Sequence, residues 1–539
     1  MRAFTGKHWP LFSVMGAYWI TVIVTVILSI HLNGQLIYPL DDTYIHMAMA
    51  KNVALHHVWG VTKYEFSSTD SSLLWTSLLA VTYLALGVNE QAPLILNLLF
   101  GTLAILSAYI FLTKYIRNRL RTFIVLSAAV FVTPIPSLTL SGMEHVLHML
   151  LSLSFVYLAA RTLSQTTKPL QKYYALLIAL SPFVTTVRYE GVFLVFVVCV
   201  LFLLRRKVLY AVTLGITALL PLILYGIWSV AHGWYFLPNP LLLKGNIPGL
   251  DPAGVMKLLL DASALHRLLD NWHILILLTA SLTLLAIYYR RKEKSCDDMK
   301  YAHLIFVGSL LLHIYFASTG WLYRYEAYLV FLGVVVVGIA VHPLLPEQFV
   351  WKNPKEALSF YLITLPLIFI LTVPFLCRAV FAHHSTLHAT NNIYEQQYQM
   401  GLFIKKFYEG KSVVLNDIGA VTYLADIQLA DLNGLGSVQP ETLKRQKNYT
   451  TRQISDWAHR RGAAIAIVYD GWFDPVGGLP PQWVQAGQWR IPGNVICAND
   501  TVSLYAVDPS GSDALMKNIR QFSAKLPADV HQDGKYMEK

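Results

Sequence analysis

The sequence predicts a polytopic α-helical membrane protein that carries an α/β domain at its C-terminal end. Of its 539 residues, 55% are hydrophobic and only 14% are charged, and the mean hydropathy is +0.48. Soluble globular domains contain about 25% charged residues. Apolar runs long enough to cross a bilayer recur up to residue 378, and short apolar runs that alternate with turn residues follow after that point.

The apolar runs form twelve segments, of which we expect eleven to span the membrane. They are 11–30, 72–88, 93–115, 122–137, 145–160, 173–187, 191–204, 208–230, 271–289, 301–318, 326–343 and 358–378. Basic clusters between them mark cytoplasmic loops. All of these clusters lie on the cytoplasmic side only if one early segment does not cross the membrane. Segment 72–88 has no basic residue at either end, so we expect it to lie along the outer face or to re-enter. Segment 11–30 lacks a small-residue cleavage site and is interpreted as a retained anchor.

This topology predicts two domains with a cytoplasmic N-terminus. The transmembrane module is expected at residues 1–379, with a long outer loop at 31–92, and an extracytoplasmic α/β domain with a polar tail at 380–539. In the outer domain, runs of β-branched and apolar residues alternate with Gly, Asn and Asp turns, which is typical of strands. The stretches 394–410 and 442–462 have a helical pattern.

Charge and motif content exclude several function classes. The net charge of +11 would indicate nucleic acid binding in a soluble protein, but here Lys and Arg lie mostly in the short loops that set membrane orientation, so no nucleic acid partner is predicted. The four cysteines include no CxxC pair, so neither a disulfide framework nor a zinc site is indicated. The sequence contains no Walker loop, GxSxG or HExxH motif, and no GxGxxG follows a strand.

The adjacent carboxylates Asp41 and Asp42 are the most informative polar feature, because they follow the first apolar segment on the outer side. A pair in a wet cavity at the membrane face would serve as a general base or hold a cation. The plainer interpretation is a solvated start of a loop. Carboxylates this close repel, so we expect one of them to have a raised pKa. Mg²⁺ or Mn²⁺ is a possible partner, but nearby His and Asp residues set no ligand spacing, so no metal ligands are assigned.

Three basic residues, Arg188, Lys244 and Arg324, lie on the outer side against the orientation rule. Glu190 and Glu326 each lie two positions from an Arg, and residues at i and i+2 do not face each other on a helix. We therefore expect each Arg to point at a carboxylate of another loop or at a bound anion. A guanidinium matches a phosphate well. The alternative is that these cations form inter-helix salt bridges or snorkel to the interface.

Besides Glu190 and Glu326, three further outer residues are predicted to contact a substrate. Glu144 lies at a junction between a loop and a helix, and its alternative role is to interact with the helix dipole. Asn239 lies between two prolines that force an extended turn just before Lys244. His56 lies in the first outer loop, where a histidine is usually no more than a surface residue.

These residues fall in six stretches that resemble, in order, the lipid-linked-sugar glycosyltransferases of the GT-C superfamily. The subgroup is similar to the mycobacterial terminal arabinofuranosyltransferase and its bacterial relatives. The stretches are LDDTYIHMAMAKNVALHHVWGV (40–61), SSTDSSLLW (67–75), SGMEHVL (141–147), VRYEG (187–191), LPNPLLLK (237–244) and RYEAYL (324–329). In the outer domain, residues 413–436 look like the strand-and-turn pattern of the family. His145, Tyr189 and Pro240 depart from the family pattern, which bears on the identity of the substrate more than on the reaction.

The resemblance implies a GT-C-like enzyme of the bacterial inner membrane. It implies inverting transfer of a hexose or pentose from a polyprenyl-phosphate donor to a cell-envelope glycan or lipid acceptor on the outer face. Asp41 or Asp42 would be the general base, and Arg188, Lys244 and Arg324 would bind the donor phosphate or the acceptor. Two rival classes are a transporter or flippase of an anionic lipid-linked substrate and a non-catalytic envelope assembly protein. Inverted repeats and broken mid-membrane helices, which would favour a transporter, are not visible in the sequence.

Overall fold

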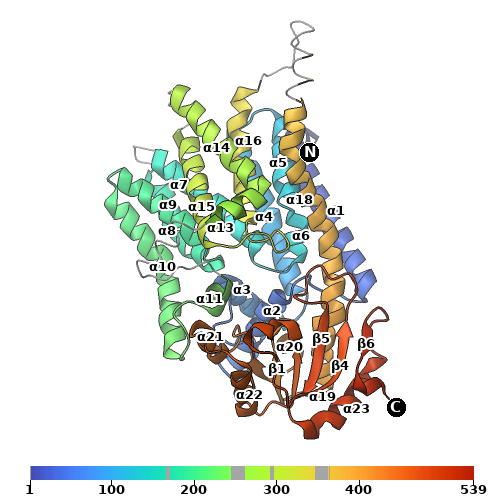
Figure 1. The fold of residues 1–539 in the computed structure, drawn as a ribbon. Coiled ribbons are helices and arrows are strands. Elements are labelled where there is room, and N and C mark those ends of the chain that lie inside the picture. Colours follow the sequence, from blue (N-terminus) through green and yellow to red (C-terminus); the bar gives the residue numbers. More distant parts are fainter. Residues whose placement is uncertain are drawn as a thin grey trace.

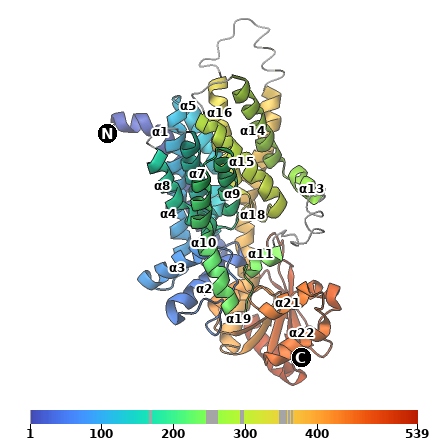
Figure 2. The same cartoon turned by 90° about the vertical axis from the view of Figure 1, so that its left-hand side faces the viewer.

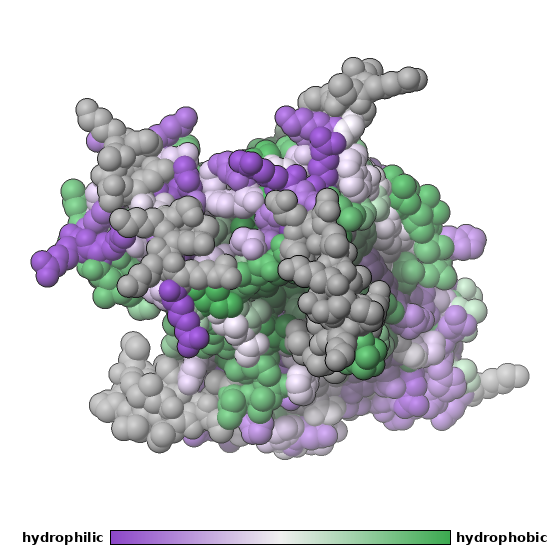
Figure 3. All heavy atoms as spheres, turned by 90° about the horizontal axis from the view of Figure 1, so that it is seen from above, coloured by the Kyte–Doolittle hydropathy of each residue, from purple (hydrophilic) through white to green (hydrophobic). Residues whose placement is uncertain are grey.

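The computed structural model shows a long helical bundle joined to a smaller α/β domain (Figure 1). It describes residues 2–164, 170–244, 262–291, 297–345 and 365–538, together with Leu358 and Leu362. The N-terminal end of the chain lies toward the end of the bundle away from the domain, and the C-terminus lies in the domain (Figures 1 and 2). Figure 3 looks onto the end of the bundle opposite the domain, where hydrophilic residues gather in groups around hydrophobic surface.

The bundle contains the helices that correspond to the eleven predicted spans. They are α1 (Arg2–Asn33), α4 (Ala92–Tyr115), α5 (Arg119–Val132), α7 (His145–Ser164), α8 (Leu170–Val187), α9 (Gly191–Leu204), α10 (Val208–Ala231), α14 (Trp272–Arg291), α15 (Asp297–Phe316), α16 (Ala327–Val341) and α18 (Leu365–Ile393). Within the described residues, α1, α4, α7, α10, α14, α15 and α16 are long and apolar enough to cross a membrane. Most of the first part of predicted span 358–378 lies outside the described residues.

Shorter helices lie between the long ones along the chain. They are α2 (Asp41–His56), α3 (Leu73–Leu86), α6 (Ile135–Leu140), α11 (Asn239–Lys244) and α13 (Ala262–Asp270). Helices α2 and α3 lie between the bundle and the domain (Figures 1 and 2). The 14 residues of α3 extend about 21 Å at 1.5 Å per residue, less than the ~30 Å hydrocarbon core of a bilayer. Helices α5 and α9, which correspond to predicted spans, are equally short, so this length does not test the prediction that segment 72–88 is not a full span.

The C-terminal domain is built on one six-stranded sheet with the order β2-β1-β3-β5-β4-β6. The strands are β1 (Ser412–Leu415), β2 (Gln428–Asp431), β3 (Ile465–Val468), β4 (Val484–Arg490), β5 (Thr501–Ala506) and β6 (His531–Asp533). Strand β1 pairs in parallel with β2 and β3, and the remaining pairs are antiparallel. The structure thus confirms the α/β domain that the sequence predicts.

The helices of this domain partly match the predicted ones. They are α19 (Gln399–Phe407), α20 (Gly419–Leu424), α21 (Val438–Arg445), α22 (Thr451–Arg460) and α23 (Ser512–Ser523), and the π-helical turn η4 (Tyr394–Tyr398) joins α18 to α19. The predicted helix at 394–410 is therefore present as η4 and α19. The predicted helical stretch 442–462 is present as the end of α21 and as α22, and Thr450 begins α22 by accepting a hydrogen bond from the Gln453 amide.

Helix α2 links the two parts through one continuous apolar core. The same buried cluster contains residues of the bundle, of α2 and of the domain. In α2, the Tyr44 ring lies 6.3 Å from the Tyr398 ring and 6.0 Å from the Tyr423 ring, measured between centroids. Further along α2, Lys51 Nζ donates to the Tyr423 carbonyl at 2.8 Å. One face of α2 is therefore packed against the domain along several turns.

Single cysteines at the two ends of the molecule should be labelled from opposite sides of the membrane. Asn118 lies between α4 and α5, Ser510 lies in the domain, and both are exposed. With the four native cysteines replaced, we expect a membrane-impermeant maleimide to label Ser510→Cys in intact spheroplasts and Asn118→Cys only after permeabilisation. Labelling of both variants from the same side contradicts the topology.

Candidate functional site

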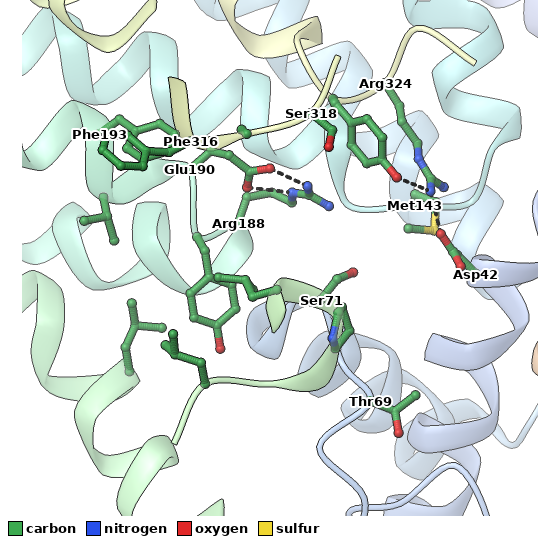
Figure 4. A pocket seen from close by; sticks show the side chains of 18 of the residues that line it. Asp42, Thr69, Ser71, Met143, Arg188, Glu190, Phe193, Phe316, Ser318 and Arg324 are labelled. Atoms are coloured by element: carbon green, nitrogen blue, oxygen red, sulfur yellow. Dashed lines mark hydrogen bonds and ion pairs between the residues drawn. The ribbon is translucent and has the colours of Figure 1, made fainter. Parts of the chain in front are cut away.

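A cavity of about 420 Å³ lies where several bundle helices meet α2 (Figure 4). It is lined by Asp42, Ile45, His46, Thr69, Ser71, Met143, Arg188, Tyr189, Glu190, Val192, Phe193, Leu219, Leu222, Ile223, Phe236, Leu237, Pro240, Leu241, Phe316, Ala317, Ser318, Arg324, Tyr325 and Leu435. The polar residues come mainly from α2, the loop before α3, the turn between α8 and α9, and the turn before α16. Leu435 is the lining residue that belongs to the domain.

The rest of the lining is apolar. Phe193 of α9 and Phe316 of α15 lie with their ring centroids 6.2 Å apart on the side of the cavity away from Asp42 (Figure 4). Leu219 and Ile223 of α10 continue this wall and are 37% and 43% exposed. The cavity is therefore not sealed along α10, and it offers an apolar chain a surface that continues to the outside of the bundle.

Arg324 and Asp42 form the ion pair on the opposite side of the cavity (Figure 4). Arg324 Nη2 donates to Asp42 Oδ2 at 2.5 Å and to the Tyr325 hydroxyl at 3.1 Å. Arg324 is only 2% exposed, and its Nε and Nη1 atoms have no hydrogen-bond partner among the described residues. Buried donors without acceptors cost about 1–3 kcal/mol each, and more when they are charged. Both nitrogens are themselves buried, so the pair leaves a cation with two unsatisfied donors at the cavity wall.

A tight turn aims Arg324 at the cavity. Residues 321–323 all have positive φ angles, of 46°, 57° and 57°, a conformation that costs about 1–2 kcal/mol for each non-glycine residue. Arg378 of α18 stabilises this turn, because it pairs with Glu326 and its Nη2 donates at 2.7 Å to the carbonyl of residue 323. Glu326 also accepts from the Gly320 amide at 2.8 Å. Glu326 thus braces the turn and does not line the cavity, so its predicted substrate contact gains no support from the structure.

Arg188 is neutralised by two carboxylates. It forms a two-pronged pair with Glu190, at 3.0 Å from Nε and 2.5 Å from Nη2, and its Nη1 donates to Glu144 at 2.8 Å. The expectation that Arg188 and Glu190 do not face each other is wrong, because both lie in the turn between α8 and α9 rather than on a helix. Burial raises the pKa of Glu190, but the charge of Arg188 outweighs it and lowers this pKa to about 2.

His46 is a site residue that the sequence analysis missed. It lies one turn after Asp42 on α2, with Nδ1 3.1 Å from Asp70 Oδ1 and Nε2 3.2 Å from Ser71 Oγ. Glu144 Oε2 lies 3.5 Å from the same Nε2. Burial lowers the pKa of His46, but the hydrogen bond and charge of Asp70 and the charge of Glu144 raise it overall. Its position four residues after Asp42 brings the two side chains to one face of α2.

Asp41 points away from the cavity and into the C-terminal domain. Its two carboxylate oxygens accept hydrogen bonds from the backbone amides of Gly419 and Ala420, each at 2.7 Å. Its pKa is raised, first by burial and then by the nearby carboxylate of Asp417. The expected cause, repulsion between Asp41 and Asp42, is therefore wrong. The acidic pair is divided, with Asp42 in the cavity wall and Asp41 outside the lining.

Asn239 and His56 do not line the cavity. Asn239 is fully buried, and its Nδ2 donates to the Gly434 carbonyl at 2.6 Å, so it fixes the turn whose next residues line the cavity. His56 lies exposed in the last turn of α2. Lys244 ends α11, but its side chain falls outside the described residues. In the described part of the chain, no group of three or more His, Cys, Asp and Glu side chains is arranged to hold a metal ion.

Comparisons with known proteins bear on the fold. A family model described as a domain of unknown function (DUF8728) matches residues 391–505, and no curated protein matches the chain. Among solved structures, ArnT from Cupriavidus metallidurans bound to undecaprenyl phosphate is similar, with a TM-score of 0.50 and 12% identity over 92% of this chain and 99% of ArnT. ArnT in the apo state gives a TM-score of 0.49 at 12% identity, over 93% of this chain and 99% of ArnT.

ArnT is a GT-C glycosyltransferase, so the likeness confirms the GT-C-like membrane fold that the sequence resemblance implies. At 12% identity the likeness concerns the fold alone. It does not single out the mycobacterial arabinofuranosyltransferase, and that finer resemblance stays a prediction. The chain is a multi-span helical membrane protein with a GT-C-like fold and a C-terminal domain that contains a sheet.

Replacing Arg188 by methionine should strongly destabilise the fold. The substitution leaves Glu144 and Glu190 buried without their cation, which costs about 3–5 kcal/mol. The matched control is Arg452→Met, because the Arg452 side chain is 89% exposed and lies 3.9 Å from Asp456. We expect a large drop in the thermal unfolding midpoint in detergent for Arg188→Met and little change for the control. Equal midpoints would show that the cluster is not structurally required.

Proposed function

We propose that this protein is a membrane glycosyltransferase that moves a sugar from a polyprenyl-phosphate donor to a cell-envelope glycan or lipid acceptor. The observation that carries the proposal is the combination of unpartnered Arg324 donors, the neighbouring Asp42 carboxylate and an extended apolar wall in one cavity. A phosphate on an isoprenoid chain has an anionic group for Arg324 and an apolar chain for the apolar wall. The likeness to ArnT, solved with undecaprenyl phosphate bound, supports the same class of donor.

In this proposal the donor lies along the cavity with its phosphate at Arg324. The Nε and Nη1 atoms of Arg324 lack partners and are buried, so the guanidinium turns toward the cavity for them to donate to the phosphate oxygens. Such charge-assisted bonds are about twice as strong as neutral ones. The polyprenyl chain follows Phe193, Phe316 and α10 toward the lipid. Arg188 is a weaker candidate for the phosphate because Glu144 and Glu190 already neutralise it.

Asp42 is the proposed general base. It accepts the proton of the acceptor hydroxyl while the acceptor oxygen forms a bond to the anomeric carbon. The bond between that carbon and the phosphate oxygen breaks, and polyprenyl phosphate leaves with the bonding electrons. A single displacement of this kind inverts the anomeric configuration. Arg324 stabilises the negative charge that develops on the leaving phosphate, which is usually a large contribution to catalysis.

The proposal also fixes where the reaction occurs. The cavity is lined by residues of α2 and by Leu435 of the domain, so it lies at the end of the bundle that faces the C-terminal domain. The basic loops predict that the opposite end is cytoplasmic. We therefore assign the reaction to the outer face of a bacterial inner membrane, with the domain outside the cytoplasm. Polyprenyl-phosphate sugars suit this location, because sugar nucleotides are not accessible there.

Asp42→Asn should abolish most sugar transfer while leaving the protein folded. General-base catalysis contributes about 10²–10⁴-fold in rate, so we expect a loss of that order. The assay supplies purified protein in nanodiscs with a panel of radiolabelled polyprenyl-phosphate hexoses and pentoses and an envelope extract, and it measures the release of free polyprenyl phosphate. Asp500→Asn, at an exposed position in the domain, is the matched control. Full release by Asp42→Asn rejects Asp42 as the base, and no release by the wild type favours a flippase or assembly protein.

Arg324→Gln should weaken the binding of undecaprenyl phosphate. A hydrogen bond to a charged group contributes about 1.5–3 kcal/mol, which corresponds to roughly 10–150-fold in affinity. Binding to protein in nanodiscs can be followed by native mass spectrometry, with Arg490→Gln as the control because the Arg490 side chain is 62% exposed. An unchanged affinity for Arg324→Gln would remove this residue from the phosphate site.

A further inference from the structure

The C-terminal domain presents the carboxyl ends of its parallel strands to α2. Strand β1 lies between β2 and β3. The next strand in the chain, β2, pairs with one edge of β1, and β3 pairs with the other edge. In sheets of this kind, ligands bind beyond the carboxyl ends of the strands where the strand order reverses. The segment after β1, which leads into α20, occupies that position. In this protein, the group that lies there is the carboxylate of Asp41.

The contact between Asp41 and this segment is close enough to require a glycine. A Cβ atom added to Gly419 would lie 2.1 Å from the Asp41 carbonyl oxygen and 2.7 Å from Asp41 Oδ2. Both are shorter than any normal contact, and the first is to a backbone atom of Asp41. The glycine therefore allows the first turn of α2 to approach the domain until both Asp41 oxygens accept backbone hydrogen bonds.

Polar groups of the domain around Asp41 are already engaged with one another. Asp417 Oδ2 accepts from Gln397 Nε2 at 2.9 Å and from the Tyr469 hydroxyl at 3.0 Å. The Tyr469 hydroxyl also donates to Gln396 Oε1 at 2.6 Å. Gln396 and Gln397 belong to the π-helical turn η4, a feature often found at functional sites. The carboxylate of Asp417 is therefore held in a hydrogen-bond network at this edge of the sheet, next to Asp41.

We propose that the C-terminal domain positions the catalytic helix, with Asp41 as the positioning residue that holds Asp42 against Arg324. The proposal rests on the proposed role of Asp42 as the base. Consecutive Cα atoms are 3.8 Å apart, so a shift of Asp41 must move Asp42 as well. Displacing a reacting group by 1 Å can cost about 100-fold in rate. The packing of Tyr44 and the bond from Lys51 hold the rest of α2 on the same domain.

Gly419→Ala tests this proposal from the domain side, at a residue that does not line the cavity. The added methyl group should push the first turn of α2 away from the domain. The control is Gly511→Ala, because a Cβ there meets nothing within 4 Å. In nanodiscs without added ligand, we expect faster hydrogen exchange of the α2 amides that follow Asp41 in Gly419→Ala than in the wild type, and unchanged exchange in Gly511→Ala. Unchanged exchange in Gly419→Ala overturns the proposal whatever reaction the protein catalyses.

The second readout separates positioning from donor binding. With the labelled polyprenyl-phosphate sugar that the wild type cleaves, Gly419→Ala and Asp41→Ala should lower kcat by about 10–100-fold and leave KM for the donor nearly unchanged. Asp41→Asn keeps one acceptor oxygen and should recover part of kcat. A wild-type kcat in folded Asp41→Ala overturns the proposal, and so does a loss that appears only in KM. A wild type that cleaves no donor instead rejects the proposed function, and hydrogen exchange still decides the positioning role.

Discussion

A buried guanidinium with unsatisfied donors is the constraint on which the candidate site depends. Arg324 has one carboxylate partner, Asp42, and two nitrogens that lack acceptors among the described residues. Burying a charge in this way is costly unless a counter-charge arrives. The cavity places this group beside an apolar wall, so the anion that fits best is one attached to a lipid chain. The chemistry proposed for the protein follows from that combination.

The surrounding structure neutralises the other cations and leaves Arg324 available. Arg188 is matched by Glu144 and Glu190, and Arg378 is matched by Glu326. These pairs also fix geometry, because Arg378 and Glu326 hold the left-handed turn that aims Arg324. The buried pair of Arg378 and Glu326 stabilises the strained backbone of that turn. Strained backbone is common where a segment presents a functional group. The structural ion pairs and the functional one are therefore parts of one arrangement.

The sequence was sufficient to predict the architecture and four of the polar residues in the cavity wall. Apolar runs predict the bundle helices because burial in lipid demands their length and composition. After residue 400, short apolar runs that alternate with turn residues predict the strands of the α/β domain. Sequence also brought together Asp42, Arg188 and Arg324, all of which line the cavity. Each of these predictions uses information that lies within a short stretch of chain.

The remaining predictions depended on tertiary contacts that no short stretch encodes. Neighbouring carboxylates of α2 look equivalent in sequence, and only the approach of Gly419 separates Asp41 from Asp42. The pairing of Arg188 with Glu190 required knowing that the chain turns there. Arg378 lies at the end of an apolar segment, and nothing local shows that it meets Glu326.

The central claim is that Arg324 holds the phosphate of a lipid whose chain follows the apolar wall. The most direct measurement is an electron cryomicroscopy structure of the protein in nanodiscs with undecaprenyl phosphate. The account predicts phosphate density within hydrogen-bond distance of Arg324 Nε or Nη1, with the isoprenoid chain along Phe193, Phe316 and α10. Density for the phosphate at a different place, with Arg324 still paired only to Asp42 and Tyr325, would contradict it.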